Sequence, residues 1–194
     1  TGVMVVFNAK VILGTRARKT RSKSFEAFSS INYPVLALVQ DGRLIQYIRP
    51  ECRETPVFYD RVNPRVALMK LIPGADCETV RWLLGRSDAL IIESFGVGGL
   101  PTYEEGSYYE PVKEGLEQGK IVVMTTQVEN EGSDLSVYQV GTHVKQSLPI
   151  FEAYDMTTEA VTAKLMWILG QTRDREKAAQ LFYTPVACDI LARK

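Results

Sequence analysis

The pattern of apolar and polar residues predicts regular alternation of strands and helices from Val66 onward. Short runs of consecutive apolar residues predict strands at 66–72, 89–93 and 121–125. Amphipathic stretches predict helices at 76–84, 111–118, 136–145, 157–169 and 174–182. Strands that are apolar throughout and separated by helices are typical of a parallel sheet covered on both faces. We therefore expect a three-layer, flavodoxin-like or Rossmann-like α/β domain in this part of the chain.

The first part of the chain has a different pattern, which predicts hairpins. Residues 3–7 predict a buried strand, followed by a tight turn and a second strand at 11–13. Asp41 and Gly42 separate two alternating runs, which is a strong hairpin signal. Residues 51–64 are rich in proline and poor in apolar side chains, so we interpret them as a linker. The predicted division is an incomplete domain at 1–50, the linker, and an α/β domain at 65–194.

Composition limits the classes of function. The 23 Lys and Arg residues balance the 23 Asp and Glu residues, so no general cationic field is available to hold nucleic acid. The longest apolar runs are far shorter than the ~20 residues that cross a bilayer, and no leader pattern opens the sequence. We therefore expect a cytoplasmic protein without membrane contact.

The cysteines and the single histidine offer no recognisable chemistry. Cys52, Cys77 and Cys188 are widely spaced and form no C-x-x-C pattern, so neither a disulfide framework nor a zinc site is expected. His143 is expected on a solvated helix surface. We expect no cofactor and no metal.

Two loops follow predicted strands at the edge of the sheet where ligands bind in such folds. The first, "SFGVGGLP", resembles a dinucleotide-binding turn, but Pro101 occupies the third glycine position and the next strand lacks the expected acid. We favour a tight turn there. The second, "TTQVENEGSD", is dense in polar side chains, which either bind a ligand or cap a helix through Ser133 or Asp134.

A third unusual stretch, "GTRARKTRSKSF", places five basic residues between positions 16 and 23. It could contact nucleic acid, form a solvated loop, or surround one functional lysine. A surface that follows phosphates normally needs more basic groups than one short stretch provides. We therefore favour an active-site loop over a nucleic-acid patch.

Four stretches together carry a family resemblance: "GVMVVFNAKVILGTRARKTRSKSFEAFSSINYP", "IIESFGVGGLP", "VVMTTQVENEGSDLSVYQVG" and "AYDMTTEAVTAKLMWILGQTRD". In this order they resemble the bacterial and archaeal L-asparaginase family, closest to its cytoplasmic type I branch. The resemblance implies the end of the family's N-terminal domain followed by its C-terminal domain. It also implies that asparagine or glutamine is hydrolysed through a threonine nucleophile. The family's T-G-G-T-I and H-G-T-D-T segments do not occur in this sequence, so the isolated chain is expected to be inactive.

The resemblance implies roles for two residues. Lys19 corresponds to the family's catalytic lysine, and we expect nearby Arg16, Arg18 and Arg21, with partial burial, to lower its pKa. Gln139 corresponds to the acidic residue that a neighbouring subunit adds to each active site. An amide can bind the substrate amino group by a hydrogen bond but cannot supply a negative charge.

Some type I members of the family also have an allosteric asparagine site, whose positions correspond to Arg18, Glu93 and Val128 in this sequence. All three residues differ from the family's, so this regulation is not carried over to the chain.

The resemblance implies a homodimer or homotetramer. It also implies that residues 3–7 normally lie inside a parallel sheet, so in this chain one strand edge should be exposed. Three other hypotheses remain. The chain could be an asparaginase-like subunit of a tRNA-dependent amidotransferase, a non-catalytic structural fragment, or an enzyme that uses Thr1 as an N-terminal nucleophile.

Overall fold

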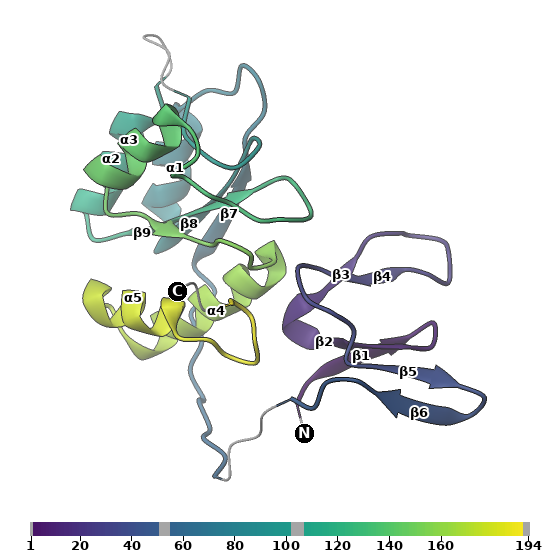
Figure 1. The fold of residues 1–194 in the computed structure, drawn as a ribbon. Helices are drawn as coiled ribbons and strands as arrows, with labels where there is room; N and C mark the ends of the chain where they lie inside the picture. The colour runs from purple at the N-terminus through teal and green to yellow at the C-terminus, as the bar shows by residue number, and fades with distance from the viewer. Residues whose placement is uncertain (1, 51–54, 102–106, 192–194) are drawn as a thin grey trace.

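The computed structural model of the protein describes residues 2–50, 55–101 and 107–191. These residues form two regions, each built around a four-stranded sheet (Figure 1). We call residues 2–50 the N-terminal region and residues 65–191 the α/β region. Thr1 and Cys52 lie outside the described residues.

The α/β region is built on a parallel sheet of order β10-β9-β8-β7. Its strands are β7 Val66–Lys70, β8 Ala89–Ser94, β9 Ile121–Thr126 and β10 Phe151–Glu152. Its helices are α1 Glu78–Arg86, α2 Tyr109–Glu117, α3 Gln139–Ser147, α4 Thr158–Gln171 and α5 Arg175–Tyr183. The predicted α/β fold class is confirmed. Strand β10 was not predicted, because two residues are too few for a recognisable pattern.

The strand order explains how the three layers form. The strands follow one another across the sheet, and right-handed crossovers then place α1, α2 and α3 on the same face. Helices α4 and α5 cover the opposite face (Figure 1). Along β8, Leu90 and Ile92 join the core under α1 to α3, while Ala89 and Ile91 join the core against α4 and α5. The continuous apolar run reflects burial on both faces.

Polar residues at the predicted positions fix three helix starts. Asp174 Oδ1 accepts a hydrogen bond from the Lys177 backbone N–H at 3.0 Å, and Thr157 Oγ1 accepts one from Ala160 at 3.1 Å. The carboxylate of Asp76 binds the N–H of Glu78 at 2.9 Å, at the start of α1. Each side chain satisfies a backbone donor that has no partner within its helix.

The N-terminal region holds an antiparallel sheet of order β1-β2-β5-β6. Its strands are β1 Met4–Phe7, β2 Lys10–Leu13, β5 Ala37–Gln40 and β6 Arg43–Gln46. Both predicted hairpins are present. Their two-residue turns, Asn8–Ala9 and Asp41–Gly42, have positive φ at both positions, as hairpin turns of this type require.

The prediction of a buried first strand was wrong. Strand β1 lies at the edge of the sheet, and Val6 is 63% exposed. Its partner among the described strands is β2, which runs antiparallel to it. A strand with one free edge and incompletely covered faces cannot bury its apolar side chains. The expected exposed edge is therefore present, although the strand belongs to an antiparallel sheet.

The basic stretch forms structure that the sequence pattern did not predict. A 3-10 turn, η1 Gly14–Arg16, leads into strand β3 Ala17–Lys19, which pairs with β4 Phe28–Ser30. This hairpin lies against the first sheet through the rings of Phe7 and Phe28, whose centroids are 5.4 Å apart.

Residues 55–64 contain no helix or strand and run along α4. The Asn63 N–H donates to the Met166 carbonyl at 2.8 Å, and the Tyr59 ring meets Trp167 edge to face. None of the helices in the described part of the chain is both long and apolar enough to cross a membrane.

Candidate active site

Lys19 is the last residue of β3, opposite Phe28 of β4, and its side chain is exposed. The hairpin therefore presents the lysine to solvent. A lysine at a strand end on a short hairpin is placed accurately only if the hairpin itself is held by other contacts. Arg16, three residues earlier, supplies those contacts.

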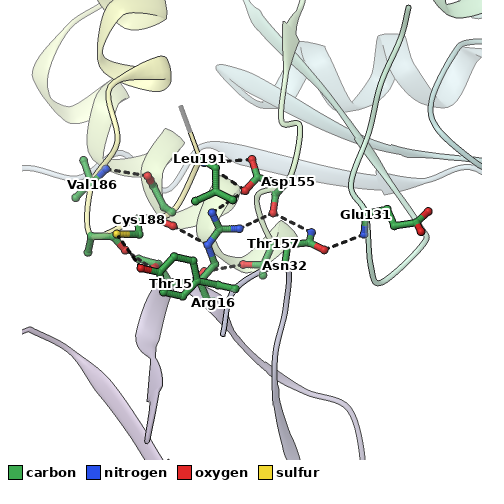
Figure 2. A network of polar contacts seen from close by, with 12 residues as sticks. Thr15, Arg16, Asn32, Glu131, Asp155, Thr157, Val186, Cys188 and Leu191 are labelled. Atoms are coloured by element: carbon green, nitrogen blue, oxygen red, sulfur yellow. Dashed lines mark hydrogen bonds and ion pairs between the residues drawn. The ribbon is translucent and has the colours of Figure 1, made fainter. Parts of the chain in front are cut away.

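Arg16 is completely buried between the two regions (Figure 2). Its Nη2 donates to the Asp155 carboxylate and its Nη1 to the Asp155 carbonyl, both at 2.7 Å. Its Nε donates to the Cys188 carbonyl at 2.6 Å. The same carboxylate accepts the Leu191 backbone N–H. A buried charge is stable only when it is paired and hydrogen-bonded in this way, so the contact defines one docked position.

Further hydrogen bonds extend this contact on both sides (Figure 2). Thr15 Oγ1 donates to the Ala187 carbonyl at 2.7 Å, and Thr157 Oγ1 donates to the Thr15 carbonyl at 3.2 Å. Asn32, just after β4, accepts the Glu131 N–H at 2.8 Å. The hairpin is thereby joined to the loop that follows β9.

The sequence predicted unpaired basic side chains around Lys19, but in the structure several of them form ion pairs. Arg16 is turned inward to Asp155, and Arg18 lies 3.6 Å from the Glu159 carboxylate. Arg21 and Lys10 both pair with Glu26, and the hydrogen bond from Lys10 lowers the pKa of that carboxyl. Four cations of this part of the chain thus have acidic partners, so like-charge repulsion on Lys19 is weaker than the sequence suggested.

The loops at the carboxyl end of the parallel sheet are bound to one another. Ser94 Oγ donates to the Gly99 carbonyl at 2.5 Å, and the Asp134 N–H donates to the Val97 carbonyl at 2.7 Å. Gln127 Nε2 donates to the carbonyls of Leu71, just after β7, and of Glu93, in the neighbouring strand β8. The glycine-rich loop of residues 94–101 therefore uses its polar groups to stabilise its own conformation, in agreement with the predicted tight turn.

A buried glutamate holds the second polar loop, residues 125–134, which follows β9. Glu152 of β10 accepts the Leu135 N–H at 2.7 Å and pairs with Lys145 at 2.8 Å. The hydrogen bond with Glu152 raises the pKa of Lys145. Asp134 accepts the Ser136 N–H at 3.0 Å, so it closes a turn ahead of α3 rather than capping the helix itself.

A polar cavity of about 300 Å³ separates the hairpin from this second loop. Its walls come from both sides of the docking contact: Thr20, Arg21, Ser29, Ser30, Ile31, Glu129 and Asn130. Ser30 Oγ is buried and has no hydrogen-bond partner among the described residues. Hydroxyl, amide, carboxylate and guanidinium groups gathered in one hollow suit a small, highly polar ligand. The cavity begins one residue after Lys19, although Lys19 is not among its lining residues.

Gln139 lies apart from the cavity lining, at the first turn of α3, and its side chain is exposed. Val137, Tyr138 and Val140 beside it are also exposed. The structure therefore does not bring Gln139 into the lining of the polar cavity next to Lys19. His143, one turn further along α3, is exposed as expected and stacks on Tyr109.

Sequence reasoning missed the residues that hold the site together. Arg16 was interpreted as part of a cationic loop, and Asn32 and Asp155 were not considered. Their partners are 99 to 172 positions away along the chain, so no local pattern could reveal them. In the described part of the chain, no group of three His, Cys, Asp or Glu side chains could hold a metal ion.

The fold and these contacts define a two-region α/β protein whose polar cavity lies between a docked hairpin and the carboxyl end of a parallel sheet. Two family sequence models match this architecture. The glutaminase/asparaginase C-terminal domain matches residues 65–182, and the asparaginase N-terminal domain matches residues 1–52. The chain therefore belongs to the asparaginase family.

Individual relatives agree with this assignment. The chain is 37% identical to the L-asparaginase of Thermococcus kodakarensis over 190 residues, which are 97% of this chain and 57% of that protein. The solved structure of the thermostable T. kodakarensis L-asparaginase superposes with a TM-score of 0.93 at 36% identity, covering 99% of this chain and 58% of that one. The L-asparaginase I structure from Vibrio cholerae gives 0.82 at 28% identity, covering 98% and 57%.

A second kind of relative is also similar. The chain is 31% identical to a glutamyl-tRNA(Gln) amidotransferase subunit of Pyrococcus furiosus, over 91% of this chain and 40% of that protein. The chain thus spans little more than half the length of the L-asparaginases it matches, and less of the amidotransferase subunit.

Proposed function

We propose that the chain is part of an L-asparaginase-type amidohydrolase: residues 1–50 are the end of its N-terminal domain, 51–64 a linker and 65–194 its C-terminal α/β domain. The docked hairpin is the observation that carries this proposal. Buried Arg16 holds the strand that ends in Lys19 next to a polar cavity, and the matched relatives include L-asparaginases. We place the protein in the cytoplasm, by likeness to the type I branch.

In the proposed reaction, Lys19 acts with the threonine and aspartate of the H-G-T-D-T segment to take the proton from the hydroxyl of the nucleophilic threonine, and both of these segments lie outside this sequence. The threonine oxygen attacks the side-chain carbonyl carbon of asparagine, and ammonia leaves with a proton. Water then hydrolyses the ester, releasing aspartate and restoring the hydroxyl. Glutamine would follow the same steps. Because the 194 residues do not include the segment that carries this threonine, we expect the chain alone to be inactive.

Gln139 is proposed to reach the active site of a neighbouring subunit in a dimer or tetramer. The exposed apolar side chains of Val137, Tyr138 and Val140 around it suit such a contact. Its amide would accept a hydrogen bond from the substrate ammonium group without pairing its charge. Gln139→Glu should therefore lower KM for asparagine more than it changes kcat.

The proposal is tested with a fusion in which the part of T. kodakarensis L-asparaginase that this chain does not match precedes residues 1–194. We expect the fusion to release ammonia from asparagine and the chain alone to release none above buffer. Lys19→Met in the fusion should lower kcat at least 100-fold. The control Lys23→Met removes a similar charge from the same loop and should stay within twofold.

Three results would count against the proposal. Ammonia release by the chain alone would disprove its inactivity, and a folded but inactive fusion would argue against asparaginase-type function. Full activity of the Lys19→Met fusion would remove Lys19 from the mechanism.

The amidotransferase relative supports a second candidate function, a subunit acting with tRNA. The chain has no net charge, which disfavours a tRNA-binding surface on this part alone. A gel shift with bulk tRNA at physiological salt separates the candidates, because tight binding would favour the amidotransferase function. Labelling of Thr1 by a covalent amidase inhibitor would instead support the N-terminal-nucleophile hypothesis.

A further inference from the structure

Three basic side chains meet one carboxylate at the amino end of the parallel sheet, opposite the carboxyl end where the polar cavity lies. Asp88 comes directly before β8, and Arg65 and Lys120 come directly before the neighbouring strands β7 and β9. Arg173 lies in the short loop between α4 and α5. We call Arg65, Lys120 and Arg173 around Asp88 the basic cluster. None of these residues lines the polar cavity.

Ion pairs hold the three cations close to the same carboxylate. Arg173 Nη1 lies 2.9 Å from Asp88 Oδ2, and Arg65 Nε lies 3.3 Å from the same oxygen. Lys120 Nζ lies 3.8 Å from Asp88 Oδ1 and donates to the Ser87 carbonyl at 2.8 Å. These charged groups come from four separate segments of the chain. The fold therefore creates the basic cluster, and no local run of basic residues announces it.

Asp88 neutralises only one of the three cations. Its Oδ2 also accepts a hydrogen bond from Asn63 Nδ2 at 2.8 Å. Burial disfavours the ionised carboxylate, but the hydrogen bonds from Asn63 and Arg173 prevail and hold the pKa of Asp88 below its usual range. Among the described residues, Arg65, Lys120 and Arg173 form ion pairs with no other acidic side chain. Two positive charges therefore remain, and an anion that joins them offsets their mutual repulsion.

Both arginines keep hydrogen-bond donors that a ligand can reach. Arg65 uses Nε and Arg173 uses Nη1 toward Asp88, and their other guanidinium nitrogens have no acceptor among the described residues. The two arginine side chains are 55% and 62% exposed, compared with 18% for Asp88. The adjacent Asp174 uses its carboxylate to cap α5. Guanidinium groups bind phosphate oxygens through paired, charge-assisted hydrogen bonds, so these exposed donors match a phosphate group.

We propose that the basic cluster binds a doubly charged phosphate group, either as inorganic phosphate or as a small phosphate monoester. The guanidinium groups of Arg65 and Arg173 donate to phosphate oxygens, and Lys120 adds its charge from behind them. A dianion neutralises the two positive charges that Asp88 leaves over. The site uses neither Lys19 nor Gln139 and lies at the other end of the sheet, so it is independent of the proposed amidohydrolase function.

The test is calorimetric titration of the 194-residue chain at low ionic strength and about pH 8, where phosphate monoesters are dianions. The ligands are inorganic phosphate, glycerol phosphate and dimethyl phosphate. We expect one saturable site per chain, and comparison of the first two ligands shows which source of the phosphate group binds better. Dimethyl phosphate has the same tetrahedral centre but one charge, so it should bind at least tenfold more weakly.

Variants of exposed arginines test the residues without disturbing the core. Arg173→Gln and Arg65→Gln each remove one charge and its donors, and each should weaken binding of the tighter phosphate ligand at least tenfold. Arg43→Gln, at an exposed arginine of β6, is the matched control and should stay within twofold. Circular dichroism checks that all three variants are folded. Absence of saturable phosphate binding, equal binding of dimethyl phosphate, or unchanged affinity in Arg173→Gln and Arg65→Gln would each overturn the proposal.

Discussion

The α/β region and the N-terminal region each contain a four-stranded sheet, but the two sheets bury their side chains to very different degrees. All six residues of β8 and of β9 are buried, whereas all four residues of β6 are exposed. The difference follows from topology. The crossover helices α1 to α3 cover one face of the parallel sheet, and α4 and α5 cover the other. The hairpin connections of the antiparallel sheet include no helices, and the β3–β4 hairpin covers only part of it. Stability of the N-terminal region must therefore come largely from its docking onto the α/β region.

Removal of Arg16 should have the largest effect on the docking of the N-terminal region onto the α/β region. Arg16→Ala leaves the buried Asp155 carboxylate without its cation, which should cost about 3–5 kcal/mol of the free energy of unfolding. Both tryptophans, Trp82 and Trp167, lie in the α/β region, so fluorescence reports on that region while far-UV circular dichroism reports on both. In urea, the two signals should change together in the parent chain and separately in the variant.

Arg18→Ala serves as the control for this experiment, because its ion pair with Glu159 is partly exposed and worth about 1 kcal/mol or less. Coincident transitions in the Arg16→Ala chain would show that docking does not depend on this contact.

Matched truncations of leucine compare the two sheets directly. Leu165 of α4 is fully buried against the parallel sheet, so Leu165→Ala should cost about 2–5 kcal/mol. Leu44 of β6 is 63% exposed, and Leu44→Ala should change stability by no more than about 0.5 kcal/mol. Urea midpoints measured by circular dichroism test the difference. Similar costs at both positions would mean that β6 is covered in solution, for example by a second copy of the chain.

Two glycines with similar backbone angles compare local packing. Gly132 and Gly42 have φ of 80° and 72°, so alanine is strained at both. A Cβ at Gly132 would collide with the Tyr154 carbonyl oxygen, whereas one at Gly42 meets nothing within 4 Å. Gly132→Ala should therefore destabilise the chain by about 1–3 kcal/mol more than Gly42→Ala, measured by thermal and urea unfolding. Equal effects would contradict this close approach of the Gly132 backbone to the Tyr154 carbonyl.

The smallest expected effect is a gain of stability in the N-terminal region. Ala9 occupies a hairpin turn position with φ of 59°, which glycine adopts without strain. Ala9→Gly should raise the free energy of unfolding by about 0.5–1 kcal/mol, seen as a higher urea midpoint. Val11→Gly within β2 is a useful contrast and should destabilise. A lower midpoint for Ala9→Gly would mean that the greater freedom of glycine in the unfolded chain outweighs the relief of strain in the turn.

The two regions also differ in how well the sequence predicts them. In the α/β region, continuous apolar runs and amphipathic stretches located the helices and the three longer strands to within a few residues, because the signals are local. In the N-terminal region, turn residues predicted both hairpins, but β3 and β4 have no alternating pattern. The exposure of Val6 could not be predicted from a run of apolar residues alone.

The candidate site was predicted in part. Lys19 and Gln139 came from resemblance, and their roles remain proposals. The burial of Arg16 depends on Asp155 and Cys188, which only the folded chain brings near, so its sequence context of basic residues was misleading. A charged residue among like charges is expected to be solvated unless a distant acidic partner is known.

The docking contact has a consequence for the order of events during synthesis. Arg16 is made well before one of its acceptors, the Cys188 carbonyl, which follows it by 172 positions. The strands β7 to β10 follow one another in space as they do in sequence, so that sheet can grow while the chain is still being translated. The N-terminal region can complete its docking only after residue 188 has left the ribosome. Until then Arg16 lacks an acceptor that it has in the folded chain, and during that interval a nascent chain would most need a chaperone.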